Sequence, residues 1–268
     1  MKVNVALAGL FVKTYFKREL EYRQSFILRY VIQVISRCVE LLGIWILLSK
    51  FDQIYGWSYH EVMLLFGRNL FSYGLAGLLL HGPMAELERL IQQGTFDAIL
   101  VMPLNPLLHL VARHFNAVFL GHIMLSFVIL GVSINALEIK WTLLSMGWFA
   151  CVMLGASLVQ GAILLAAGTT SFWLVKSRSL LNTAIYGVRG FITYPISIYD
   201  RWVQVVLTLL VPFAFVNFFP AEFFLGKAES SIFPAYFQLG TPLVGMILFS
   251  LAYRLWSYAI NHYHSTGS

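Results

Sequence analysis

Charged residues are scarce in this chain. Only 11% of its 268 residues are Asp, Glu, Lys or Arg, whereas 59% are hydrophobic. Soluble domains carry about 25% charged residues, because a chain that folds in water must cover its core with polar side chains. The mean hydropathy of +0.76 therefore excludes an ordinary soluble protein and indicates a membrane protein, since lipid does not demand a polar exterior.

Cysteine and the common catalytic motifs are also scarce or absent. Cys38 and Cys151 both lie in apolar stretches, so we expect neither a disulfide framework nor a metal site. No G-x-x-x-x-G-K-[ST] motif occurs, so we expect no ATP, and no other cofactor, to be bound by this chain itself. His60-Glu61 lacks the second half of H-E-x-x-H, and Gly155-Ala156-Ser157 lacks the second glycine of a nucleophile elbow. The chain is therefore not expected to be an enzyme.

What the chain does contain is a series of long apolar stretches. A transmembrane helix needs about 20 such residues. Six candidate spans follow, at residues 25–48, 58–80, 107–133, 142–174, 179–199 and 236–258. The expected fold is an all-α polytopic membrane protein with six transmembrane helices, and residues 1–268 are expected to form a single transmembrane domain.

Two further segments do not fit a simple span. Residues 1–24 are interrupted by basic side chains, and their apolar residues recur at helical spacing, which predicts a helix lying in the cytoplasmic membrane interface. Residues 200–224 are apolar but contain Pro212 and Pro220. This stretch is either a seventh span or an outer re-entrant hairpin, which must pack on other helices because irregular backbone is not tolerated against lipid.

The basic residues indicate an orientation. With six spans and the N-terminus inside, the outer side holds only Lys50, Lys140, Arg201 and Lys227, and most of the 18 Lys and Arg residues lie in or beside cytoplasmic segments. Both termini are therefore expected in the cytoplasm. The net charge of +6 follows from this arrangement, and we expect no nucleic-acid partner.

The segment 81–106 is the longest polar connection. Pro83 is expected to open it, residues 85–91 read as a short amphipathic helix, and Gly94 is placed to end that helix. Such a helix could be a docking surface or part of a plain connecting loop, and spacing alone does not decide between them.

Two motifs carry a family resemblance. They are Gly94-x-x-Asp97-x-x-Leu100-x-x-Pro103-x-x-Pro106 and Tyr194-Pro195-Ile196-Ser197-Ile198-Tyr199, the latter followed by Pro212 and the run Asn217-Phe218-Phe219-Pro220-Ala221. With an N-terminal interfacial helix and six spans, the chain resembles the ABC-2-type permeases, in particular the short ABC-2 permease family that is encoded beside a separate ATPase subunit. The resemblance covers nearly the whole chain.

The resemblance implies partners and roles. The chain would be the transmembrane subunit of an ABC exporter in the bacterial cytoplasmic membrane, paired with a second permease chain, identical or related, and with P-loop ATPase subunits that hold ATP and Mg²⁺. Its cargo would be amphiphilic or hydrophobic: a lipid, a glycolipid, a peptide or a drug. Segment 81–106 would contain the coupling helix, with the candidate ATPase contacts Glu86, Glu88, Arg89, Gly94 and Asp97. Segment 200–224 would cap the path on the outer side, with the gate candidates Tyr194, Pro195, Pro212, Phe215 and Pro220.

Away from their ends, the expected spans contain the charged residues Arg37, Glu40, Arg68 and Arg189. Such charges are costly in a membrane and usually face a bundle interior or a cavity. Arg37 and Glu40 are three residues apart and can pair on one helix. The charges could lock helices through an ion pair such as Arg68 with Glu40, or Arg68 or Arg37 could meet an anionic headgroup or an acidic substrate.

Two other functional classes remain open at this stage. An ion-coupled secondary transporter would use Arg37, Glu40 and Arg68 as coupling charges, although the paired broken helices of such folds are not evident. A membrane enzyme or a non-transporting assembly subunit would need a polar cluster at one depth. Dependence on ATP and on an ATPase partner separates the permease from both.

Overall fold

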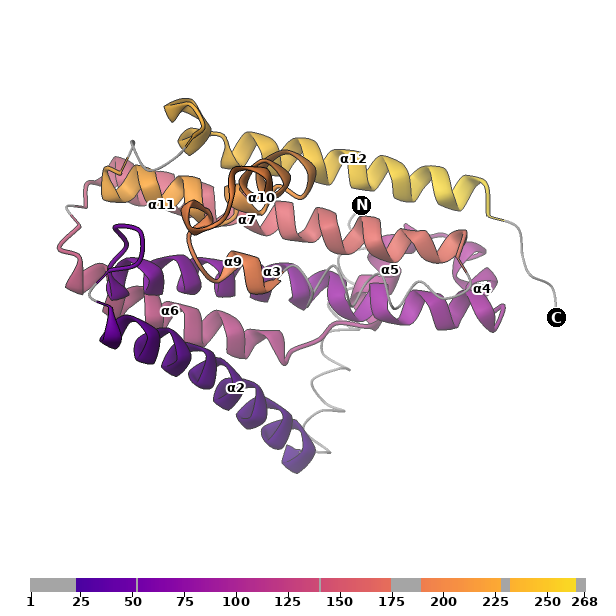
Figure 1. The fold of residues 1–268 in the computed structure, drawn as a ribbon. Helices are drawn as coiled ribbons and strands as arrows, with labels where there is room; N and C mark the ends of the chain where they lie inside the picture. Colours follow the sequence, from indigo (N-terminus) through magenta and orange to yellow (C-terminus); the bar gives the residue numbers. More distant parts are fainter. Residues whose placement is uncertain (1–22, 52, 140, 175–188, 228–231, 264–268) are drawn as a thin grey trace.

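The structure is a computed structural model that describes residues 23–51, 53–139, 141–174, 189–227 and 232–263 (Figure 1). The described residues form helices joined by turns and short loops, with no strand and one isolated bridge between Ile54 and Trp57. The helices are α2 (Arg23–Lys50), α3 (Tyr59–Gln92), α4 (Asp97–Leu100), α5 (Pro106–Arg113), α6 (Phe119–Ala136), α7 (Leu143–Thr169), α9 (Arg189–Ile192), α10 (Arg201–Val205), α11 (Phe218–Leu225) and α12 (Thr241–Asn261). Short 3₁₀ turns lie at Thr170–Phe172, Ile196–Ile198, Phe213–Phe215 and Ala235–Leu239, and a π-helical turn at Val206–Leu210.

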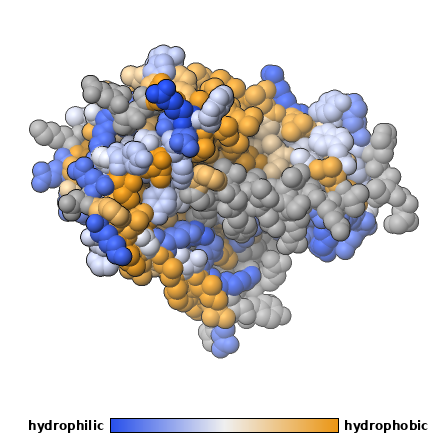
Figure 2. Space-filling view, in the orientation of Figure 1, coloured by the Kyte–Doolittle hydropathy of each residue, from blue (hydrophilic) through white to orange (hydrophobic). Residues whose placement is uncertain are grey.

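Five of these helices are long and apolar enough to cross a membrane: α2, α3, α6, α7 and α12. A sixth candidate is a pair, Arg201–Leu210 and Phe213–Leu225, bent by 79° at the break between them. The all-α, polytopic membrane fold expected from the sequence is thereby confirmed. Figure 2 shows hydrophobic residues along α2 and over α12, and hydrophilic residues at both ends of the molecule.

The core of the bundle is α3, which lies between α6 and α7, with α12 packed on α7 (Figure 1). Glycines permit these close approaches. A Cβ atom on Gly245 of α12 would lie 2.3 Å from the carbonyl oxygen of Gly155 on α7, and one on Gly168 would collide with Met84 of α3. Gly155 and Gly168 of α7 therefore serve helix packing within this chain.

The helix α2 lies largely apart from the bundle. It meets the others mainly near its C-terminal end, where Ile44 and Leu48 are buried, and its N-terminal half diverges from α6 in Figure 1. Most of its remaining apolar side chains are exposed, Val39 and Leu42 among them. Such a surface requires lipid or another chain around it.

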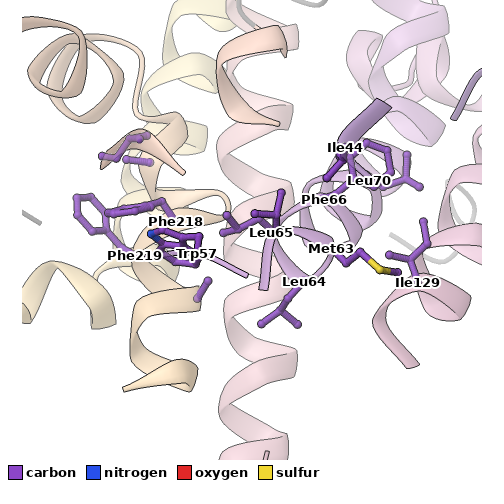
Figure 3. Close-up of a cluster of buried hydrophobic side chains, with 14 of the residues drawn as sticks. Ile44, Trp57, Met63, Leu64, Leu65, Phe66, Leu70, Ile129, Phe218 and Phe219 are labelled. Carbon is purple, nitrogen blue, oxygen red and sulfur yellow. The ribbon is translucent and has the colours of Figure 1, made fainter. Parts of the chain in front are cut away.

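A cluster of buried hydrophobic residues lies at the end of the bundle opposite α4. Trp57 packs against Phe218 with ring centroids 5.6 Å apart and the rings tilted by 39°, and Phe219 lies beside them (Figure 3). Lys227 reaches across to this region, where its ammonium nitrogen lies 2.7 Å from Glu61 and 4.8 Å from the centre of the Trp57 ring. Glu61 also accepts a hydrogen bond from the backbone N–H of Ser58 at 2.7 Å and so helps to cap α3.

The boundaries of three predicted spans need correction. Pro83 does not open a loop: α3 runs through it to Gln92 without a break. The predicted span 107–133 is two helices, α5 and α6, because Asn116 accepts a hydrogen bond from the backbone N–H of Val118 through its side chain and so starts a new helix. The last span begins at Thr241 rather than at residue 236, after a separate 3₁₀ turn.

Other predictions fall partly outside the described residues. Residues 1–22 of the expected interfacial helix are not described, and Arg23 already belongs to α2. Of the expected fifth span, 179–199, residues 179–188 lie outside the description, and the described part is the short helix α9 followed by a 3₁₀ turn. The side chain of Arg189 also lies outside the described part.

Candidate coupling surface and transport path

The helix α3 is longer than a membrane requires. Its 34 residues extend about 51 Å at 1.5 Å per residue, whereas the hydrocarbon core is about 30 Å thick. Its C-terminal end carries Glu86, Glu88 and Arg89. Of these, Arg89 is exposed and the two glutamates are half-buried.

The chain reverses sharply after α3. Gly94 has a φ of +65°, a backbone conformation that glycine adopts without strain. The N–H of Phe96 then donates to the carbonyl of Leu90 at 3.1 Å, and α4 begins at Asp97. The structure thus brings Glu86, Glu88, Arg89, Gly94 and Asp97 to one end of the bundle, with Arg89 exposed and ion-paired to Glu86.

Next to this turn lies an exposed apolar patch. It consists of Val101, Met102, Pro103 and Leu108, and Val101 is 83% exposed. We name this set, together with Glu86, Glu88, Arg89, Gly94 and Asp97, the coupling surface. The sequence analysis missed the apolar members, although four apolar or proline residues in succession, Val101 to Leu104, inside a polar connection were a usable signal.

Behind the coupling surface, an aromatic cluster joins it to two other helices. The ring of Phe96 is fully buried and lies 5.3 Å from Phe172, which follows α7, and 5.4 Å from Tyr263, which follows α12. Phe172 in turn lies 5.5 Å from Trp256 of α12. Because buried aromatic groups pack at fixed distances, a displacement of this turn must move the ends of α7 and α12 with it.

Two histidines lie beside the same turn. Burial lowers the pKa of His114 below its ordinary value, and the nearby Arg113, Arg89 and His109 lower it as well, while Glu86 acts in the opposite direction. The pKa of His109 is lowered first by burial and then by Arg113. Both imidazoles are therefore held towards the neutral form, because their charged forms would lose hydration next to positive neighbours.

Within the membrane, Arg37 and Glu40 form the ion pair that their spacing allows, with 2.5 Å between Nη1 and Oε1. Arg68 does not join them. Its guanidinium is fully buried and donates to the backbone carbonyls of Asn217 at 3.2 Å and Val216 at 3.4 Å. The suggested Arg68–Glu40 lock is therefore wrong, because Arg68 extends towards the bent pair and Glu40 pairs on its own helix.

The contact between Arg68 and Val216 has a local cause. The carbonyl of Val216 lies before Asn217, the N-cap residue of α11, and so receives no hydrogen bond from within that helix. The guanidinium supplies the missing donor. The positive group also lies 5.9 Å from the centre of the Phe149 ring on α7.

A chain of amide and hydroxyl groups extends this polar site across the bundle. Gln160 of α7 donates through Nε2 to Asn69 Oδ1 at 3.0 Å and to Ser72 Oγ at 2.7 Å, and Ser72 Oγ donates to the Arg68 carbonyl at 3.0 Å. On the other side, the Asn217 side chain donates to the carbonyl of Ile192. We call Arg68, Asn69, Ser72, Gln160 and Asn217 the polar network. The sequence analysis did not single out Asn69, Ser72 or Gln160, and it named Asn217 only as part of a family motif.

The gate candidates lie around the bent pair. Phe215 is buried, with its ring centroid 4.9 Å from that of Phe219, and its carbonyl accepts from Thr241 Oγ1 at 2.8 Å. Pro195 and Pro220 are buried, whereas Tyr194 and Pro212 are half-buried. Phe213, Phe215, Phe218 and Phe219 are all buried, so ordinary lipid-facing aromatics do not account for them. Among the described residues, no group of His, Cys, Asp or Glu is arranged to hold a metal ion.

Comparison with known proteins gives one match. A family model described as "ABC-2 family transporter protein" matches residues 34–267. No similar protein was found among curated proteins, and no solved structure matches. The family match includes most of α2 and every later helix, and with it the coupling surface, the polar network and the bent pair, so this multi-pass membrane chain belongs to the ABC-2 family of transporter proteins.

Proposed function

We propose that this chain is the transmembrane subunit of an ABC exporter and that separate P-loop subunits bind and hydrolyse the ATP. Family membership supports the transporter role. The observation that carries the proposal is the single, uninterrupted α3, which bears the coupling surface at one end and the buried Arg68 about 27 Å further along. One rigid helix therefore links the surface that would meet an ATPase with a polar site inside the membrane.

The mechanism follows from these connections. ATP-driven closure of the ATPase pair would press on the coupling surface and shift the α3 end and its turn as one body. The aromatic cluster of Phe96, Phe172, Trp256 and Tyr263 would pass that shift to α7 and α12. Arg68 would pass it to the carbonyls at the bend, so that the bent pair moves when α3 moves.

An amphiphilic cargo suits the interior on the side of the bend. A groove of about 260 Å³ lies between α7, α12 and residues 210–212, and its lining, which includes Ala162, Ala166 and Leu248, is almost wholly apolar. An acyl chain or another apolar group fits such a lining. The buried phenylalanines around Phe215 would close the path beyond it.

The proposal extends to the assembly and its location. The apolar faces of α2 and α12 are mostly exposed, which leaves room for a second permease chain and for lipids. We place both termini in the cytoplasm of a bacterial cell, with the bent pair as a re-entrant hairpin on the outer side. A reporter fused to the C-terminus that is active only outside the cytoplasm should stay inactive, and an active one would reverse this orientation.

Co-purification tests the ATPase partner. The tagged chain, isolated from its host in mild detergent, should bring a P-loop ATPase with it at about one-to-one stoichiometry. Val101→Asp places a charge on the most exposed apolar residue of the coupling surface, so it should reduce the ATPase yield by at least about tenfold. Leu143→Asp adds the same charge at an exposed apolar residue at the start of α7, far from the coupling surface, and should leave the yield unchanged.

Each result bears on the proposal. Equal ATPase yields from the wild type and Val101→Asp would remove the coupling surface from the proposal. The absence of any ATPase, both in detergent and after cross-linking in intact membranes, would overturn the exporter assignment. A second membrane chain in the purified sample would identify a heterodimer, and its absence from a dimeric sample would identify a homodimer.

A further inference from the structure

A groove separates the N-terminal half of α2 from α3 and α6. Its volume is about 440 Å³, within the range of pockets that hold small ligands. Its lining is mixed. The polar side chains are Arg29, Gln33, Ser36 and Arg37 from α2, His81 from α3 and Asn116 from the link before α6, and they lie beside Ile32, Tyr73, Val118 and Phe119.

The α2 residues of this groove occupy one face of the helix. Arg29, Gln33 and Arg37 follow each other at intervals of four residues, which places them above one another. The other face carries exposed apolar residues, among them Leu28 and Ile35. The helix α2 thus presents apolar side chains to the bilayer and a polar stripe to the groove, an arrangement that membranes tolerate where a polar ligand or water occupies the groove.

Arg37 keeps hydrogen-bonding capacity for a ligand. Both of its bonds to Glu40, at 2.5 and 2.7 Å, come from the same nitrogen, Nη1. Its Nε is buried and has no hydrogen-bond partner, and only 11% of the side chain is exposed. A buried N–H without an acceptor is unfavourable, and Arg37 lines the groove, so an oxyanion bound there would supply an acceptor once the side chain turns towards it.

The chemistry of the stripe identifies the ligand class. Guanidinium groups flanked by amides are the usual protein donors to phosphate oxygens. Arg29 and Arg37 are separated by about 12 Å along α2, so the stripe extends from the end of the helix well into the membrane-spanning segment. A lipid headgroup can bind at that depth while its chains remain in the bilayer beside the groove, whereas a freely soluble ion would have to leave water to reach it.

We propose that this groove binds the phosphate-bearing headgroup of an anionic lipid or lipid-like amphiphile, which enters from the leaflet at the N-terminal end of α2. Its role as a transported substrate rests on the function proposed above, whereas the binding itself does not. The groove would then be the site of entry, and the path near Phe215 the exit.

Lipid retention measured by native mass spectrometry tests the site without any ATPase. The purified chain, with whatever partners accompany it, is titrated with dioleoyl-phosphatidylglycerol, and in parallel with dioleoylglycerol, which has the same chains and no phosphate. The double variant Arg37→Gln/Glu40→Gln removes the guanidinium without leaving a lone carboxylate. The matched control Glu61→Gln/Lys227→Gln removes the ion pair at the opposite end of the bundle.

We expect the wild type and the control variant to bind phosphatidylglycerol with equal affinity and to bind dioleoylglycerol clearly more weakly. Arg37→Gln/Glu40→Gln should bind phosphatidylglycerol at least about tenfold more weakly than the wild type does. Equal binding by the Arg37 double variant would overturn the site. Equal binding of dioleoylglycerol would show that phosphate is not recognised. Displacement of the lipid by inorganic phosphate at the lipid's own concentration would make this a site for free anions and would refute the lipid assignment. If the lipid site fails this test while the chain still co-purifies with an ATPase, the site is refuted and the proposed function is unaffected.

Discussion

The burial of Arg68 is not explained by a gain in the stability of the fold. It is fully buried, and among the described residues it contacts carbonyl groups and the Phe149 ring but no carboxylate. A buried charge without a counter-charge lowers the free energy of unfolding relative to an apolar residue of similar size. Its retention therefore favours a role in the movement of the bent pair.

Replacement of Arg68 by Met tests this role. Met fills a similar volume without a charge, so the thermal midpoint in detergent should stay the same or rise. Transport should fall at least about tenfold, because the loss of both hydrogen bonds to the bend removes more than about 1.4 kcal/mol of coupling. Arg68→Lys keeps the charge but loses the forked guanidinium donor, so its transport rate should lie between those of the wild type and Arg68→Met. Full transport by Arg68→Met, at normal expression, would show that Arg68 is dispensable.

Gly245 tests the crossing of α7 and α12. A methyl group there would lie 2.3 Å from the Gly155 carbonyl oxygen, so the two helices would have to separate. Gly245→Ala should lower the free energy of unfolding by about 1–3 kcal/mol. Gly147→Ala, on α7 with no atom within 4 Å of the added group, should be neutral or slightly stabilising because alanine favours helix. Equal thermal midpoints for the two variants would contradict the close crossing.

At the scale of elements, the continuity of α3 was the main feature that local sequence signals obscured. Pro83 and the polar residues after it resemble the start of a loop, because proline lacks the N–H that a helix interior needs. In the structure, Pro83 is buried and Gly82 lies directly against the carbonyl of His114. Tertiary packing on the link before α6 therefore offsets the lost hydrogen bond, and such packing leaves no local trace in the sequence.

The histidines beside α5 predict a pH dependence. With a pKa below the ordinary value of about 6.5, His114 binds fewer protons in the folded chain than in the unfolded chain as the pH falls through this window. The free energy of unfolding should therefore decrease as the pH falls below about 6.5 and level off below the lowered pKa.

Thermal midpoints between pH 8 and pH 5 measure this dependence. His114→Gln should flatten the decrease without abolishing it, because burial and Arg113 also lower the pKa of His109. His60→Gln, at an exposed histidine, controls for the substitution itself. A decrease of the same size in His114→Gln and in the wild type would contradict the assignment.

At the scale of the whole molecule, composition and apolar stretches were sufficient for the membrane fold, because lipid requires long helices with internally satisfied backbone groups. The Arg37–Glu40 pair followed from helical spacing. The polar network could not be predicted, since Arg68, Gln160 and Asn217 are far apart in the sequence and meet only through packing. The break between α5 and α6 was also not predicted, because it depends on hydrogen bonds of Asn116, and residues 107–133 look like one continuous apolar span in the sequence.

The most direct measurement of the central claim is a cross-link from the coupling surface in intact membranes of the native host. Cys38 and Cys151 are free and exposed, so both are first replaced by serine, and a single cysteine is introduced by Val101→Cys. The account predicts that this residue cross-links to a P-loop ATPase, and that Leu143→Cys, 90% exposed at the start of α7 and far from the coupling surface, does not. A chain that cross-links to no ATPase through Val101→Cys while it still transports its cargo would contradict the account and favour an ion-coupled transporter.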